Sequence, residues 1–135
     1  MSSPIDTALI TRSLELVAER GDPTEAVYAR VFAAHPEMEP LFVRDTTGSV
    51  RGNMLTEALT ALLDFADRDA YGSNMMRAEI VNHENLGVPP EVFAAFYRAL
   101  RDTFAEMLGA AWTNDIDAAW NDLLARIESA LARRM

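Results

Sequence analysis

Residues 80–93 read Ile-Val-Asn-His-Glu-Asn-Leu-Gly-Val-Pro-Pro-Glu-Val-Phe, and this stretch is the most informative part of the sequence. It places His83 at the end of a helical segment, and a Gly-Val turn and the pair Pro89-Pro90 separate that segment from the next helix. The chain contains only two histidines. Because a neutral imidazole is a common metal ligand, we regard His83 as a candidate metal-binding residue.

Length and composition describe a small acidic protein. Its 135 residues suffice for one substantial core, and we expect a single domain over residues 1–135. A net charge of −9 with scattered basic residues makes nucleic acid and anionic membrane surfaces poor partners. The lack of cysteine excludes disulfides and thiolate metal sites. Because the sequence shows neither a signal peptide nor an apolar run of roughly 20 residues, we expect a cytoplasmic protein.

The hydrophobic pattern predicts an all-α fold. Apolar residues recur at intervals of three and four, and alternation with period two is absent over any useful length. Gly21, Pro36 and Gly109 interrupt the pattern, as residues at helix ends do. Helices are therefore expected at about residues 5–18, 23–35, 49–67, 74–83, 89–108 and 114–131, with a short element at residues 36–41.

Three local patterns, taken in order, resemble the globin family, and the likeness extends over residues 14–127. Residues 35–42, His-Pro-Glu-Met-Glu-Pro-Leu-Phe, are similar to the globin corner that contains a proline and a haem-stacking phenylalanine. His83 followed by Gly87-Val88 resembles the turn of the proximal histidine, and residues 108–120 resemble the last junction between helices. The chain looks like a bacterial single-domain globin or the globin domain of flavohaemoglobins. The resemblance implies a globin-like fold of seven to eight helices around a haem pocket.

The resemblance also implies a role for each candidate site residue. His83 would bind the iron of a b-type haem through one ring nitrogen, while the other nitrogen donates to a backbone carbonyl about one turn earlier. Phe42 would lie flat on the porphyrin, and Val88 and Phe93 would pack on its proximal side. Tyr28 matches the distal tyrosine of bacterial globins and would donate a hydrogen bond to a bound gas.

The distal helix can be aligned with the family in two registers. In the first, which we prefer, Arg51 takes the position of the distal residue, Leu55 covers the iron and Gly52 allows a close helix crossing. The side chain of Arg51 could instead turn to solvent or reach a haem propionate. In the second register, Met54 and Ala58 line the pocket. Neither register supplies a distal histidine or glutamine, so stabilisation of a bound ligand would depend mainly on the distal tyrosine.

The sequence departs from flavohaemoglobins in two ways. Those proteins support the proximal histidine with a tyrosine and a glutamate, and the matching positions here are Phe93 and the C-terminus near Met135. Glu79 occupies a position that is usually aliphatic in globins, and we hypothesise that its carboxylate approaches the imidazole of His83. Flavohaemoglobins also continue into a flavin- and nicotinamide-binding reductase, so we expect this chain to depend on a separate reductase.

From these features we expect a haem protein that reversibly binds dioxygen, and also nitric oxide or carbon monoxide, as a monomer or homodimer. Two alternatives remain. In the first, the protein is an enzyme, either a nitric oxide dioxygenase or a weak peroxidase, which takes electrons from a separate reductase. In the second, it is a globin-fold sensor or interaction module without stable haem, whose interior is filled by packing.

Overall fold

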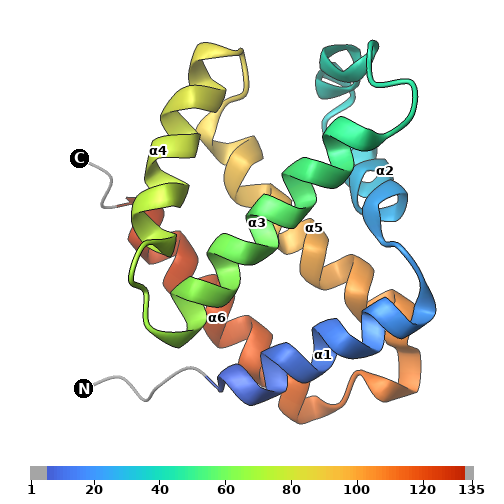
Figure 1. Cartoon of the computed structure of the whole chain (residues 1–135), viewed down its shortest axis with the longest axis vertical. Helices are drawn as coiled ribbons and strands as arrows, with labels where there is room; N and C mark the ends of the chain where they lie inside the picture. Colours follow the sequence, from blue (N-terminus) through green and yellow to red (C-terminus); the bar gives the residue numbers. More distant parts are fainter. Residues whose placement is uncertain (1–5, 133–135) are drawn as a thin grey trace.

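The computed structural model describes residues 6–132, and helices account for all the regular structure in that range (Figure 1). The elements are α1 (Thr7–Arg20), α2 (Thr24–Ala34), η1 (Pro36–Phe42), α3 (Ser49–Asp67), α4 (Gly72–Asn85), α5 (Pro90–Leu108), η2 (Gly109–Ala111) and α6 (Asn114–Ala132), where η marks a 3₁₀ helix. The all-α prediction is confirmed. Ile5, where the first helix was expected to begin, lies outside the described residues. None of the described helices is long and apolar enough to cross a membrane.

Polar side chains define where the first two helices begin. The backbone N–H of Leu9 donates to Asp6 Oδ1 at 3.2 Å, which satisfies a free amide in the first turn of α1. Asp22 Oδ1 accepts from the backbone N–H of Thr24 at 2.9 Å and from its hydroxyl at 2.6 Å. Since these carboxylates bond to amides that have no partner within the helix, they stabilise the N-termini of α1 and α2.

Much of the hydrophobic core lies where α1, α5 and α6 meet beside α3 (Figure 1). Leu100, Phe104 and Trp120 have no exposed surface. The indole N–H of Trp120 donates to Ser13 Oγ at 2.9 Å, and the Ser13 hydroxyl donates to the carbonyl oxygen of Ile10 at 2.6 Å. The buried polar atoms of this region are therefore paired.

Helix α4 is fixed against α3 by a close approach of the two backbones. A Cβ atom on Gly72 would lie 2.5 Å from the carbonyl oxygen of Ala61, so only glycine fits there. Asp64 Oδ2 accepts hydrogen bonds from the backbone N–H groups of Tyr71 and Gly72, at 2.8 and 2.6 Å. These contacts determine where α4 starts, and thereby the position of the residues at its far end.

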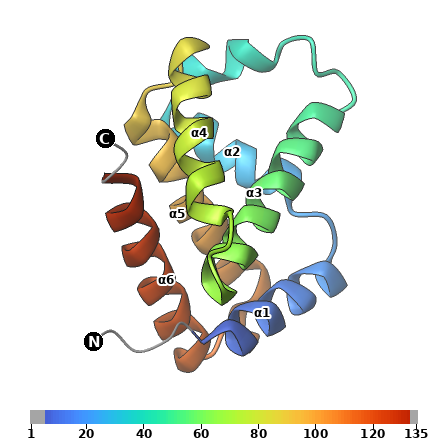
Figure 2. The same cartoon turned by 60° about the vertical axis from the view of Figure 1, so that its left-hand side comes forward.

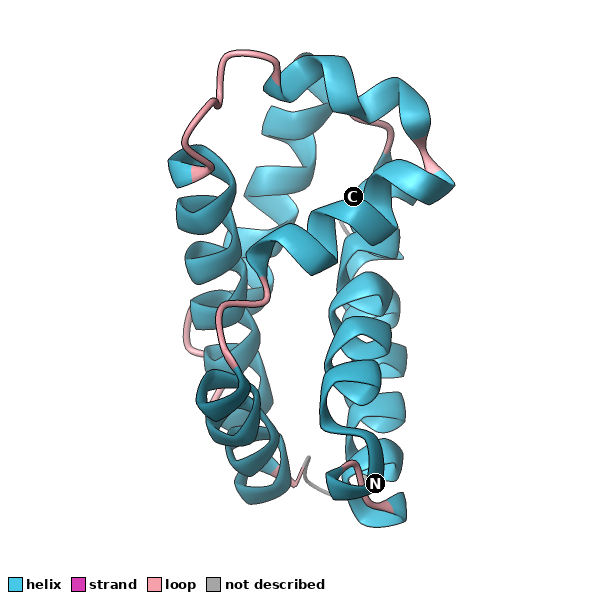
Figure 3. Ribbon diagram, turned by 90° about the vertical axis from the view of Figure 1, so that its right-hand side faces the viewer, coloured by secondary structure: helices cyan, strands magenta, loops and turns pink. Residues whose placement is uncertain are grey.

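The end of α4 and the short helix η1 lie at the end of the molecule away from α1 (Figures 1 and 2). Seen from the side, the helices form two layers joined by short connections (Figure 3). Helix α2 packs against α5 and η1, and α4 packs against α3 and α5. This arrangement places the candidate site residues from η1, α2, α3, α4 and α5 at one end of the fold.

Candidate functional site

A cavity of about 550 Å³ opens between η1, α2, α3, α4 and α5. This volume falls within the range of small-molecule and cofactor sites. Most of its lining is aromatic or aliphatic and includes Val31, Phe32, Phe42, Met54, Phe93 and Phe96. Only a few polar side chains reach the cavity, so each of them is a candidate for a specific interaction with an occupant.

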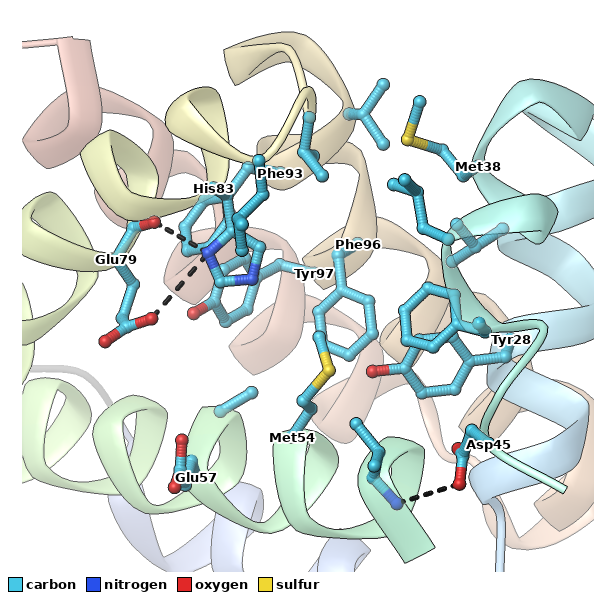
Figure 4. A pocket seen from close by; sticks show the side chains of 18 of the residues that line it. Tyr28, Met38, Asp45, Met54, Glu57, Glu79, His83, Phe93, Phe96 and Tyr97 are labelled. Carbon is cyan, nitrogen blue, oxygen red and sulfur yellow. Dashed lines mark hydrogen bonds and ion pairs between the residues drawn. The ribbon is translucent and has the colours of Figure 1, made fainter. Parts of the chain in front are cut away.

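The imidazole of His83 stands on one side of this cavity with one nitrogen engaged and one free (Figure 4). Its Nδ1 lies 2.7 Å from the carbonyl oxygen of Glu79, one turn earlier on α4, as the sequence predicts. Because a carbonyl only accepts, Nδ1 of the neutral ring carries the proton, and Nε2 keeps its lone pair. The ring of Phe93 lies edge-on, 5.1 Å from the imidazole. The other nitrogen, Nε2, faces the cavity and could serve as a ligand atom.

The backbone after His83 is arranged by the sequence that ends α4. The carbonyl oxygen of His83 accepts from the N–H groups of Leu86 at 3.0 Å and Val88 at 2.8 Å. Gly87 between them has a φ of +94°, a conformation that favours glycine. This turn sends the chain back over the cavity, and Val88 becomes part of its wall.

The hydroxyl of Tyr28 reaches the cavity from α2 (Figure 4). The residue is 3% exposed, and within residues 6–132 its hydroxyl oxygen has no hydrogen-bond partner. Burial raises the pKa of Tyr28, and the nearby Arg51 and Asp45 modify that effect in opposite directions, so the phenol stays protonated. An unpaired buried hydroxyl costs roughly 1–3 kcal/mol. An acceptor atom inside the cavity would remove this penalty.

Aromatic rings surround Tyr28 and shape that side of the cavity. The centroid of its ring lies 5.4 Å from that of Phe42 and 5.6 Å from that of Phe96. Phe42 also lies 5.5 Å from Phe32. Tilted contacts at these distances are favourable for aromatic pairs and hold the rings in place. The corner phenylalanine predicted from residues 35–42 is thus positioned on the cavity wall.

The preferred register of the distal helix is wrong, and the structure has the second one. Met54 and Ala58 line the cavity, whereas Leu55 is 4% exposed and belongs to the hydrophobic core on another face of α3. The close crossing expected at Gly52 is absent, since a Cβ atom built there would meet nothing within 4 Å. The packing argument for the first register therefore does not hold.

Arg51 is bound at the start of α3 and does not line the cavity. Its Nε lies 3.1 Å from Asp45 Oδ2, and its Nη2 lies 3.5 Å from Glu25 Oε1. Burial acts to raise the pKa of Asp45, but hydrogen bonds from the backbone of Arg51 and Val50 and from the Arg51 side chain outweigh it and lower the pKa. The same carboxylate therefore caps α3 and determines the direction of the arginine.

Several cavity residues were missed by sequence reasoning. Tyr97 is 3% exposed and lines the cavity beside Phe93, with ring centroids 6.0 Å apart. The spacing of Phe93, Phe96 and Tyr97 at i, i+3 and i+4 puts them on one face of α5 and would have identified them. Glu57 and Arg44 are exposed and also border the cavity.

Comparison with known proteins relates most of the chain to one family. A family model described as Globin matches residues 25–131. The chain is 30% identical over 123 residues to a flavohemoprotein of Rhizobium meliloti (strain 1021), and the alignment covers 79% of this chain and 28% of the relative. It is 27% identical over 122 residues to a flavohemoprotein of Bordetella pertussis, with 89% and 30% covered. The chain thus spans less than a third of the length of these relatives. No solved structure matches at a significant level.

The family match covers most of the residues that build the cavity, from α2 to α6. It agrees with the all-helical architecture and with the globin-like fold that the sequence predicts. Members of this family typically bind haem and gases. The chain belongs to the globin family.

Proposed function

We propose that this protein holds a b-type haem in the cavity and reversibly binds a diatomic gas there. One observation carries the proposal: an open apolar cavity has a free imidazole nitrogen of His83 on one side and the unpaired hydroxyl of Tyr28 on the other. A filled interior, which the haem-free alternative requires, does not fit a volume of about 550 Å³. The chain contains no cysteine to attach a porphyrin through thioether bonds, which supports a haem of the b type over one of the c type.

The residues present suit a haem. His83 would supply a nitrogen ligand to the iron, and Phe42, Val88 and Phe93 would contact the porphyrin. Arg44, an exposed residue at the cavity edge, is placed to pair with a carboxylate side chain of the porphyrin. Met54 stands on α3, across the cavity from His83 (Figure 4).

The haem would supply the iron at which a diatomic gas binds, and the protein would determine orientation, polarity and access. The Nδ1–H bond to the Glu79 carbonyl fixes the tautomer and direction of His83. The buried phenol of Tyr28 would donate a hydrogen bond to the gas and slow its release. The mostly aromatic and aliphatic lining would keep the surroundings of that hydrogen bond low in polarity and so strengthen it.

The proposal is tested by adding haem to the purified protein and to a His83→Ala variant, and by recording absorbance spectra of the ferric, ferrous and carbon monoxide forms. We expect a Soret band and reversible gas binding in the wild-type protein. The variant should lose haem far more readily, by more than the roughly 10–100-fold that loss of a supporting group costs. Equal haem retention and equal spectra in both proteins would overturn the proposal.

Enzymatic turnover is a second candidate, because both named relatives are flavohemoproteins and extend well beyond the length of this chain. In that case a separate reductase would return the iron to the ferrous state, and the protein would act as a nitric oxide dioxygenase or peroxidase. Steady nitric oxide consumption in the presence of an added flavin reductase would support this activity. Consumption limited to one equivalent per haem would favour reversible gas binding alone.

A further inference from the structure

We propose that Glu79 is a positioning residue that acts on the haem iron through His83. Its carboxylate would strengthen the imidazole as an electron donor and lower the reduction potential of the iron. This inference rests on the proposed function, because it requires a haem bound through His83. The backbone carbonyl and the side-chain carboxylate of Glu79 both approach Nδ1 of His83 (Figure 4).

Two oxygens of Glu79 approach Nδ1 of His83. The carbonyl oxygen lies at 2.7 Å and accepts the hydrogen bond, and the carboxylate Oε2 lies at 3.6 Å. The i, i+4 spacing on α4 places the two side chains on the same helix face. The N–H bond of the imidazole therefore faces a neutral acceptor and a negative charge from a single residue.

Neighbouring groups hold the imidazole of His83 close to the charge of the Glu79 carboxylate. Phe93 lies against the ring at 5.1 Å, and the backbone after His83 is fixed by hydrogen bonds from Leu86 and Val88. Tyr97, which is 3% exposed, lines the same cavity. The contact with Phe93 and the hydrogen bond to the Glu79 carbonyl oxygen hold the ring with its N–H directed at Glu79.

The charge of Glu79 is not balanced by an arginine. Over the described range, His83 is the only side chain that the Glu79 carboxylate meets within ion-pair distance. Glu79 is half-exposed, its side chain being 39% accessible, so water screens part of its field. The unscreened part of the electric field of the carboxylate polarises the N–H bond of the imidazole and increases electron donation from Nε2. A more strongly donating ligand favours the ferric over the ferrous state.

A matched pair of variants tests this inference in the haem-loaded protein. Glu79→Gln removes the charge beside His83. Glu57→Gln removes the same charge from another wall of the same cavity, on α3, without a contact to His83. The readouts are the ferric/ferrous midpoint potential and the iron–histidine stretching frequency of the ferrous protein, measured by resonance Raman scattering.

We expect Glu79→Gln to shift the ferric/ferrous equilibrium about tenfold towards the ferrous state, which corresponds to a rise of about 59 mV for a one-electron couple. The iron–histidine stretching frequency should fall. Glu57→Gln should change the potential less and leave that frequency unchanged. Glu79→Asp, which withdraws the carboxylate by one methylene group, should give intermediate values.

Two contrary results can be told apart. If both glutamine variants shift the potential equally and neither changes the stretching frequency, the role of Glu79 is refuted, while haem binding through His83 still stands. If His83→Ala retains haem with an unchanged spectrum, both the proposed function and this inference are refuted. Far-ultraviolet circular dichroism of each variant verifies that the helices have formed.

Discussion

The buried polar atoms around Trp120 have hydrogen-bond partners, whereas the buried hydroxyl of Tyr28 has none among the described residues. At Trp120 the indole N–H and the hydroxyl of Ser13 each donate a hydrogen bond, and the surrounding side chains leave no exposed surface. At Tyr28 a hydroxyl that is equally hidden from solvent has no partner among the described residues, and it borders a cavity of about 550 Å³. One end of the fold is closely packed, and the other has a cavity with an unpaired polar atom, among the described residues, in its wall.

This difference shows that the cavity end of the fold contributes less to the stability of the folded state than the region around Trp120. Protein interiors are normally packed as densely as organic crystals, and buried polar groups normally have partners. An empty apolar cavity loses dispersion contacts along its walls, and an unpaired hydroxyl adds a desolvation penalty. Departures from ideal packing of this kind are expected at functional sites. Three predictions examine the contrast, and they follow in order of expected effect.

The largest effect is expected from truncating one phenylalanine in each region. Phe104 has no exposed surface and packs against Trp120, with ring centroids 5.8 Å apart. Phe104→Ala should reduce the free energy of unfolding by roughly 3–5 kcal/mol. Phe42 is half-buried and already borders the cavity, so Phe42→Ala should cost the haem-free protein much less but accelerate haem loss. Urea denaturation and haem transfer to an excess of apomyoglobin measure the two quantities.

The ranking of the two variants should therefore reverse between the assays. Phe104→Ala should dominate in denaturant, and Phe42→Ala should dominate in haem transfer at temperatures where both are folded. If Phe42→Ala destabilises the haem-free protein as much as Phe104→Ala does, the cavity wall is part of the main core and the contrast is wrong.

A smaller effect of opposite sign is expected at the unpaired hydroxyl. Tyr28→Phe removes an unsatisfied buried group without changing the ring, so it should stabilise the haem-free protein by roughly 1 kcal/mol. The same change should speed gas release from the ferrous haem protein by up to about tenfold, since one hydrogen bond to the ligand is lost. Denaturation curves and ligand-displacement kinetics measure these effects. A destabilised haem-free variant would show that the hydroxyl has a partner in solution.

The proximal side of the site could be predicted from the sequence because it is encoded locally. A histidine four residues after Glu79, followed by Gly87-Val88 and a proline, dictates the hydrogen bond from Nδ1, the end of α4 and the turn. The predicted bounds of α3 were confirmed for the same reason, since the segment contains a clear helical pattern. These features need only residues within a few turns of one another.

The distal register could not be predicted because two faces of α3 are apolar. Leu55 and Leu62 belong to the face that packs in the core, while Met54 and Ala58 belong to the face that lines the cavity. Hydrophobic periodicity describes both faces equally well and does not say which one meets the core. The choice depends on contacts with distant helices and on the loop before α3, where Asp45 binds the first turn of the helix.

The smallest effect is expected in the loop before α3. It tests whether the polar groups at the edge of the cavity have hydrogen-bond partners. Asp45 has a lowered pKa because it accepts hydrogen bonds from the backbone of Val50 and Arg51 and from the Arg51 side chain. A carboxyl group whose pKa is lowered on folding adds stability above its unfolded pKa, about 3.9, and loses it as the pH falls through the folded value. Asp45→Asn should therefore lower the melting temperature by a few degrees at neutral pH.

The difference between wild type and Asp45→Asn should shrink as the pH is lowered below about 4, because the wild-type carboxyl then becomes neutral as well. Calorimetry at several pH values measures it. Asp67→Asn is a suitable control: within residues 6–132 the Asp67 carboxylate meets only the exposed Arg68, at 3.8 Å, and its loss should change stability little. A difference between wild type and Asp45→Asn that persists unchanged into acid would mean that shape, and not charge, holds this loop. In that case the direction of Arg51 away from the cavity would need another cause.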